Sequence, residues 1–168
     1  ASLSPERGHD LRCVIASWHY CPVALLELLA KDTDRRVRGG VAANPYCVVP
    51  LLKVLAKDKN RHVRQRVAQN ENSSVELLEE LAKDDVRDVR YRVARHPSCP
   101  VPVLELLAND NDEIFRGAVA SNANCPSSLL TLLAKDGVPG IRRAAFENPN
   151  FTSPFAAKPD HGGHIRLP

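Results

Sequence analysis

Arginines recur along this 168-residue chain at a spacing that would bring them together on one surface. Arg66 and Arg92 are 26 residues apart, and so are Gln65 and Tyr91. If the chain repeats with that period, these side chains are neighbours in consecutive units and form a basic strip that contains an aromatic ring. Guanidinium groups bind phosphates and carboxylates. The candidate partner-binding residues are Arg61, Gln65, Arg66, Gln69, Arg87, Tyr91, Arg92 and Arg95.

Two interpretations of this basic strip are open. The equivalent positions of the flanking units hold small residues, such as Gly39, Gly40 and Gly117, so the positive charge is concentrated in the middle of the chain. Such a surface suits an acidic peptide or a phosphate backbone. The alternative is a solvated helix face, because surface charge usually serves solubility. The balancing charges would then be Glu76, Glu79 and Glu80.

Four of the five cysteines recur with the same period. A metal site needs ligands within a few ångströms of one ion, and side chains spaced one repeat apart do not converge. Because cysteine is among the most buried residue types, we expect this column to pack in the core as reduced thiols. The column consists of Cys21, Cys47, Cys99 and Cys125, with Ser73 and Phe151 at the equivalent positions. We expect no metal and no cofactor.

The sequence offers no constellation typical of an enzyme. It holds no Ser–His–Asp or Cys–His cluster, no glycine-rich phosphate loop and no paired carboxylates suited to hydrolysis. His161 and His164 near the C-terminus are two histidines alone, which make a weak metal site. We therefore expect a protein without catalytic activity.

The period of 26 residues accounts for nearly all of the chain. A Val-Ala pair recurs at Val41, Val67, Val93 and Val119. A period of roughly 20–50 residues is typical of a solenoid, in which a unit buries its apolar face only against its neighbours. We expect one solenoid domain over residues 1–157, closed by capping half-repeats. Residues 158–168 show no period and are expected to form a loose or disordered tail.

Each unit is predicted to contain two short helices. In the first helix of one unit, residues 61–69, Val63 and Val67 fall on one face. The expected N-caps of the first helices are Asp34, Asn60 and Asp112. The second helix restarts at a proline, which suits the first helical position, and continues with a leucine stripe. These prolines are Pro22, Pro100 and Pro126. The fold class is all-α, an α-solenoid whose repeats combine an α-helix with a short α- or 3₁₀-helix.

The recurring motifs resemble a known family. The segments Val-Arg-x-x-Val-Ala-x-Asn-Pro and Leu-Leu-x-x-Leu-Ala-x-Asp, over residues 10–157, are similar to the leucine-rich repeat variant (LRV) family, which resembles the helical HEAT repeats. This resemblance implies a right-handed superhelix of alternating α and 3₁₀ helices. The founding type of the family also carries an iron–sulfur cluster on a separate cysteine-rich segment. Only Cys13 and Cys21 lie near the N-terminus here, so the resemblance implies the fold and not the cluster.

Two charged columns run through every unit. Their arginines are Arg12, Arg38, Arg64, Arg90, Arg116 and Arg142, and their aspartates are Asp32, Asp58, Asp84, Asp110 and Asp136. The aspartates end the second helices, where negative charge opposes the helix dipole, so each is expected to have a specific partner. The resemblance to HEAT-type repeats implies an Asp–Arg ladder between successive units, and the arginine fork suits bidentate pairing. The alternative is that these arginines project as a phosphate-binding stripe.

An asparagine column is expected to satisfy backbone groups at the turn between the two helices. It contains Asn44, Asn70, Asn122 and Asn148, and it is broken by Trp18 and His96. We expect Trp18 to pack over the open N-terminal face and His96 to replace the asparagine as a turn residue.

Composition narrows the choice of function only slightly. The net charge is +3, too small to indicate a polyanion by itself, and no apolar run is long enough to cross a membrane. We expect a cytoplasmic, non-catalytic scaffold that binds a protein or an acidic peptide along the basic strip. The alternative is a module that binds nucleic acid with the same strip.

Overall fold

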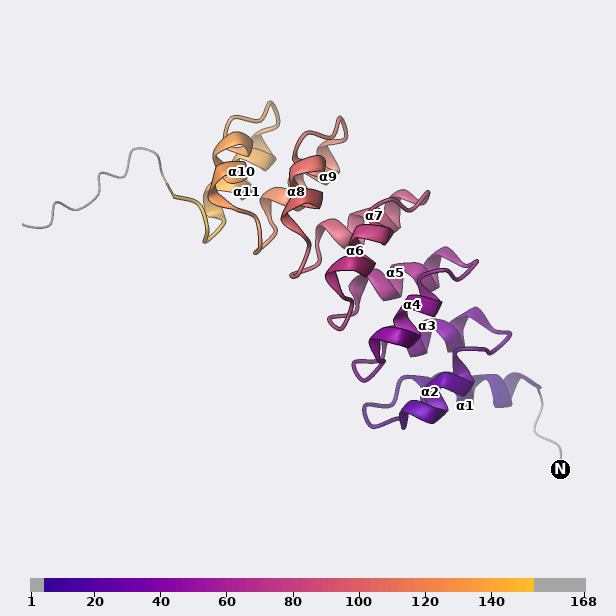
Figure 1. Cartoon of the computed structure of the whole chain (residues 1–168). Coiled ribbons are helices and arrows are strands. Elements are labelled where there is room, and N and C mark those ends of the chain that lie inside the picture. The colour runs from indigo at the N-terminus through magenta and orange to yellow at the C-terminus, as the bar shows by residue number, and fades with distance from the viewer. Residues whose placement is uncertain (1–4, 153–168) are drawn as a thin grey trace, which may run out of the picture.

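The computed structural model describes residues 5–152, and every regular element in that range is an α-helix. The helices follow one another along an elongated stack (Figure 1). The first helices of the units are α1 (Pro5–Ala16), α3 (Arg35–Ala43), α5 (Arg61–Gln69), α7 (Arg87–Ala94), α9 (Glu113–Ala120) and α11 (Pro139–Glu147). The second helices are α2 (Val23–Leu29), α4 (Val49–Leu55), α6 (Val75–Leu81), α8 (Val101–Ala108) and α10 (Ser127–Leu133). The predicted all-α solenoid is confirmed. The predicted tail, residues 158–168, lies outside the described residues.

The helices form two rows. Each first helix packs against the first helices of the neighbouring units, from α1 through to α11. The second helices pack mainly on the first helices beside them, and they lie farther from one another than the first helices do. The units are therefore joined mainly along the first-helix row.

The first helices begin and end where the sequence predicts. The side chains of Asp34, Asn60 and Asp112 accept hydrogen bonds from the backbone N–H two residues later, at 2.7–3.0 Å. These bonds satisfy N–H groups that a helix start leaves without an intrahelical partner. At the other end, Asn44 and Asn70 adopt extended backbone angles and stop α3 and α5.

The second helices are short α-helices with tighter bonds at their ends. In the first of them, the Leu25 N–H donates to the Pro22 carbonyl at 2.9 Å and the Asp32 N–H donates to the Leu29 carbonyl at 3.1 Å. Both are bonds of the 3₁₀ type, spaced three residues apart. The prediction that Pro22, Pro100 and Pro126 occupy the first helical position is wrong by one residue. Their φ angles of −58° to −70° suit a helix, but their ψ angles of 141–151° are extended, so they are N-caps.

One continuous apolar core runs between the two rows, and it includes the cysteine column. Cys47, Cys99 and Cys125 are fully buried, so the predicted packing role is confirmed. Burial raises the pKa of Cys47 and of Cys125 to about 11, and that of Cys99 to about 12. These thiols therefore stay protonated and act as small apolar groups.

The prediction for Trp18 is wrong, because its side chain is 61% exposed. The next unit uses its backbone instead. The Asn44 amide donates to the Trp18 carbonyl at 2.9 Å and to the Ala16 carbonyl at 2.8 Å. A side chain is not needed for that contact, so the ring is left in solvent.

Candidate binding surface

The two charged columns form the predicted ladder at most junctions between units. Arg38 donates to both carboxylate oxygens of Asp58, from Nε at 2.6 Å and from Nη2 at 3.0 Å. Arg64 makes the same pair with Asp84, also at 2.6 and 3.0 Å. Equivalent contacts join Arg12 to Asp32 and Arg116 to Asp136. Because these arginines pair with aspartates of the same chain, the alternative of a phosphate-binding stripe does not apply to them.

Each ladder group also makes contacts within its own unit. The Nη1 of Arg38 donates to the carbonyls of Asp32 and Thr33, at 2.7 and 3.0 Å. The Asp58 carboxylate accepts from the Asn60 N–H at 2.8 Å. Burial raises the pKa of Asp58, but the Arg38 guanidinium and the Asn60 N–H outweigh it and lower the pKa below its ordinary value. The carboxylate is therefore ionised and held at both oxygens.

One rung of the ladder takes a different form, between α7 and α9. Arg90 keeps its bonds to the carbonyls of Asp84 and Asp85, but its guanidinium lies 5.5 Å above the ring of Phe115. Phe115 occupies the place that Val37, Val63 and Val89 hold in earlier units. The ion pair across this junction is made instead by Arg87 with Asp112, the N-cap of α9.

The asparagine column forms a second ladder through backbone carbonyls. Asn70 donates to the carbonyls of Ala42 and Asn44 at 2.7 and 2.9 Å, and Asn122 and Asn148 repeat this pattern. His96 takes the same place, and its Nε2 lies 3.0 Å from the Asn70 carbonyl while Nδ1 accepts from the Ser98 N–H. The predicted role of His96 as a turn residue is confirmed.

A further set of asparagines reaches back to the preceding unit, and we did not predict it from the sequence. Their side-chain amides donate to carbonyls of the loop one unit earlier, at 2.6–3.2 Å. They are Asn72, Asn124 and Asn150, each two residues after the first column. The available signal was their spacing by multiples of 26 residues. The column is incomplete, because Ser98 stands at the equivalent position of one unit.

Three arginines of the basic strip lie in solvent on adjacent first helices. Arg66 projects from α5, Arg92 lies on α7 and Arg95 caps that helix. All three are exposed, and none of them forms an ion pair with a carboxylate among the side chains that the structure describes, residues 11–152. Arg92 and Arg95 flank the ring of Tyr91, with their guanidinium carbons 5.9 and 6.0 Å from its centroid. The strip thus offers cations arranged around a half-buried aromatic ring.

The other candidate residues are placed differently. Arg61 is exposed at the start of α5, without an ion pair to a described residue. The Gln65 Oε1 accepts from the His62 Nδ1 at 3.1 Å, and the Gln65 side-chain amide donates to Asp88 at 3.3 Å. Arg87 is tied to Asp112, so its charge is already neutralised by the fold. Gln69 lies beside Arg92 and Arg95 in the lining of one cavity of about 450 Å³.

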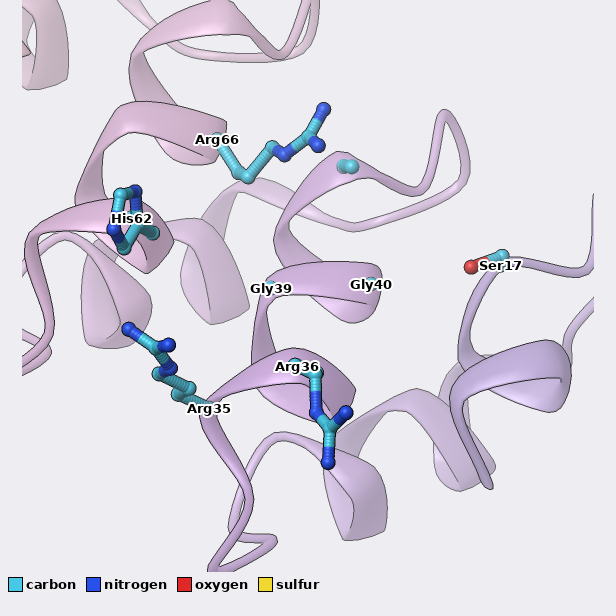
Figure 2. A pocket seen from close by; sticks show the side chains of 8 residues that line it. Ser17, Arg35, Arg36, Gly39, Gly40, His62 and Arg66 are labelled. Atoms are coloured by element: carbon cyan, nitrogen blue, oxygen red, sulfur yellow. The ribbon is translucent and has the colours of Figure 1, made fainter. Parts of the chain in front are cut away.

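A second cavity, also of about 450 Å³, opens beside α3 at the Arg66 end of the strip. Figure 2 shows the Arg66 side chain reaching from α5 across the turn of α3 that carries Gly39 and Gly40. Arg35 and Arg36 lie in the first turn of the same helix, and we did not single them out from the sequence. The available signal was the pair of glycines inside a helix, in the turn that follows Arg35 and Arg36.

The described residues show no evident catalytic site. No group of three or more His, Cys, Asp or Glu side chains within that part of the chain is placed to hold a metal ion. No helix among those described is both long and apolar enough to span a membrane.

Comparison with known proteins supports the architecture. The structure matches a solved leucine-rich repeat variant, described as having a novel repetitive protein structural motif, with a TM-score of 0.58 and 29% sequence identity. The match covers 83% of this chain and 61% of the other, so this chain spans less than two thirds of that protein. No protein-family model and no curated protein sequence matches the chain. The resemblance predicted from the repeat motifs is confirmed at the level of structure.

Proposed function

We propose that this chain, a helical-repeat solenoid like the leucine-rich repeat variant, is a non-catalytic scaffold that binds an acidic segment of a partner protein. The segment would lie across α5 and α7 and contact Arg66, Arg92 and Arg95. A rigid stack offers a preformed surface, so little ordering free energy is lost when a partner binds.

The observation that carries this proposal is the division of the arginines into two sets. The ladder arginines Arg38 and Arg64 are largely buried and spend their donors on carboxylates and carbonyls. Arg66, only two residues after Arg64, is exposed and without an ion pair in the described chain. The fold therefore accounts for the first set and leaves the second available for a ligand.

The glutamates considered as balancing charges do not neutralise the strip. Glu76, Glu79 and Glu80 belong to α6, which lies in the second-helix row. Glu80 lies 3.8 Å from Lys57, its ion-pair partner. These three glutamates thus do not offset the charge of Arg66, Arg92 and Arg95, and this favours an acidic ligand over a purely solvated face.

The length of the strip favours a peptide over nucleic acid. At the positions equivalent to Arg66 and Arg92, α3 has Gly40 and α9 has Ala118. At this position of the repeat the arginine row therefore covers α5 and α7 alone, whereas binding to a nucleic-acid backbone draws on several phosphate contacts. A short acidic segment fits that reach.

The test is titration of a labelled glutamate-rich peptide, compared with a mixed-sequence DNA, across a salt series. The proposal expects the peptide to bind and the double variant Arg66→Glu, Arg92→Glu to lose that binding with an unchanged melting temperature. A matched control, Lys53→Glu with Lys83→Glu, makes the same charge change on the second-helix side and should keep it.

Two results would contradict the proposal. One is equal loss of peptide binding in the strip variant and in the lysine control, which would indicate an effect of net charge alone. The other is DNA binding that is tighter than peptide binding, falls steeply with salt and is lost in the strip variant. That result would support the nucleic-acid alternative in its place.

A further inference from the structure

The cavity beside α3 has the properties of a site for a single anion, and we call it the Gly39 groove. It has a volume of about 450 Å³ and opens on the same face as the basic strip (Figure 2). Its lining consists of Ser17, Arg35, Arg36, Gly39, Gly40, Ala43, His62 and Arg66. Among the side chains that the structure describes, three arginines contribute to this lining and no carboxylate does.

The donors of the groove come from separate elements. Arg66 belongs to α5, and Arg35 and Arg36 belong to α3, while Ser17, in the turn after α1, already donates its hydroxyl to the Cys13 carbonyl at 3.0 Å. Arg36 also contacts the Asp34 carboxylate at 3.2 Å, at the beginning of α3. Arg35 and Arg66 have no ion pair with any described residue, so their charge is available to a ligand.

The two glycines of the groove differ in what the fold requires of them. A Cβ on Gly40 would lie 3.0 Å from the Ala16 Cβ, so this glycine lets α3 pack closely on α1. A Cβ on Gly39 would meet nothing within 4 Å. Glycine inside a helix is less favourable than alanine, and packing gives no reason for it at this position. What Gly39 provides is open space in front of the arginines.

The equivalent positions in the next two units hold larger side chains. Gln65 and Arg66 take the places of Gly39 and Gly40 on α5, and Tyr91 and Arg92 take them on α7. In those units side chains occupy the two positions, whereas in α3 both positions are glycine and the groove is open. On α9 the equivalents are the small residues Gly117 and Ala118, but a Cβ on Gly117 would lie 3.8 Å from the Ile141 side chain, whereas the space in front of Gly39 is open.

We propose that the Gly39 groove binds the phosphoryl group of a phosphorylated side chain. This inference rests on the proposed function, since the phosphorylated residue would belong to the acidic segment on the strip. A phosphomonoester carries a charge of about −1.5 to −2 at neutral pH and three acceptor oxygens. Those oxygens can accept hydrogen bonds from the guanidinium groups of Arg35 on α3 and Arg66 on α5, which both line the groove. A carboxylate has two oxygens and one charge, so it uses fewer of them.

The first experiment titrates inorganic phosphate and follows the backbone amide signals of Gly39 and Gly40 by NMR. We expect these signals to shift and saturate, and Gly39→Gln and Arg66→Gln to weaken binding about tenfold or more. Gly39→Gln installs the residue found at the equivalent position of α5, so it fills the groove without a new charge. Arg92→Gln is the matched control and should change phosphate affinity less than about twofold.

A second variant keeps the test informative if a larger side chain disturbs the helix. Gly39→Ala adds only a methyl group in open space, so it should raise the melting temperature and keep phosphate binding. Absence of any phosphate-dependent shift in the wild-type protein would overturn the proposal. So would phosphate affinity in Gly39→Gln equal to that of the wild type.

The final arm separates this inference from the proposed function. A glutamate-rich peptide that carries one phosphoserine is compared with the same peptide carrying serine. We expect the phosphorylated peptide to bind more tightly, and Gly39→Gln to remove that advantage while leaving the serine peptide unaffected. Equal affinity of the two peptides for the wild-type protein overturns the phosphoryl site and leaves the strip proposal standing. The single variant Arg92→Glu tests the strip, because the strip proposal expects it to weaken binding of both peptides.

Discussion

The junction between α3 and α5 and the junction between α7 and α9 are built from the same repeat, but they are fastened differently. At the first, Arg38 and Asp58 form a bidentate ion pair with side chains only 9% and 8% exposed. At the second, the guanidinium of Arg90 lies over the ring of Phe115, and a more exposed pair, Arg87 with Asp112, joins the units.

This difference shows that the ladder residues have two roles: they bond to nearby backbone groups, and they form the Arg–Asp ion pair. Arg90 and Asp110 each keep the contacts within their own unit that their counterparts make: Arg90 donates to the Asp84 carbonyl, and Asp110 accepts from the Asp112 N–H. What changes is the side chain between them, where Phe115 replaces a valine. The exposed basic strip also ends at α7, so the change in fastening coincides with the boundary of the proposed binding surface.

The largest expected difference between the junctions is the effect of removing the ladder arginine. Arg38→Ala leaves the Asp58 carboxylate largely buried without its partner, and we expect a loss of about 3–5 kcal/mol in the free energy of unfolding. Arg90→Ala removes two carbonyl contacts and a cation–π contact, and we expect a loss of about 1–2 kcal/mol. Urea denaturation of both variants measures the difference. Equal losses would mean that the two junctions are fastened alike.

The acid sensitivity of the first junction is the next effect. The pKa of Asp58 is lowered in the folded protein from its ordinary value of 3.8. The unfolded state then binds more protons, so the stabilisation is present above the ordinary value and is lost as the pH falls through the folded one. We expect Asp58→Asn to flatten the decline of stability below about pH 4. An unchanged slope of unfolding free energy against pH would show that this carboxylate is not held by the rung.

Much of this comparison is present in the sequence, and part of it is not. The Asp and Arg columns, the N-caps and the cysteine packing follow from a 26-residue register, because identical units must make identical contacts. The missing Arg90–Asp110 ion pair could not be predicted from the repeat, because both residues are present in the sequence. What differs is Phe115, which stands where the earlier units have a valine. Phe115 was the visible signal, as an aromatic in a valine column.

The binding surface was only partly predictable for a related reason. The exposed cations Arg66 and Arg92 follow from the register, because they face away from the valine column. Which cations the fold neutralises depends on partners in the next unit, as the pairing of Arg87 with Asp112 shows. The Gly39 groove forms because α3 has glycines where α5 and α7 have larger side chains. A sequence shows such a gap only when the equivalent positions of the units are compared.

Replacing the aromatic should convert the second junction toward the first. In Phe115→Val the ring no longer lies beneath the guanidinium, and we expect Arg90 to pair with Asp110. The cavity cost of a large-to-small change is then offset in part, so the net loss should be about 1–2 kcal/mol. NMR of the Arg90 Nε–H reports the new pair. A signal that stays unchanged would mean that Phe115 is not what interrupts the rung.

The smallest expected effect concerns the asparagine ladder near the same junction. His96 makes one contact with the preceding unit, to the Asn70 carbonyl, whereas Asn122 makes two with the unit before it. We expect His96→Asn to add the second bond and to raise stability by up to about 1 kcal/mol. The reverse change, Asn70→His, should lower the melting temperature. A clear loss of stability in His96→Asn would show that the imidazole ring is required for packing.

Double-mutant cycles on the two arginine–aspartate combinations test the central claim most directly. The account predicts a coupling of about 2–3 kcal/mol between Arg38 and Asp58 and a coupling below about 0.5 kcal/mol between Arg90 and Asp110. That result would place the interruption of the ladder at a single junction. Comparable couplings for the two combinations would contradict it and would mean that the ladder runs unbroken through α7 and α9.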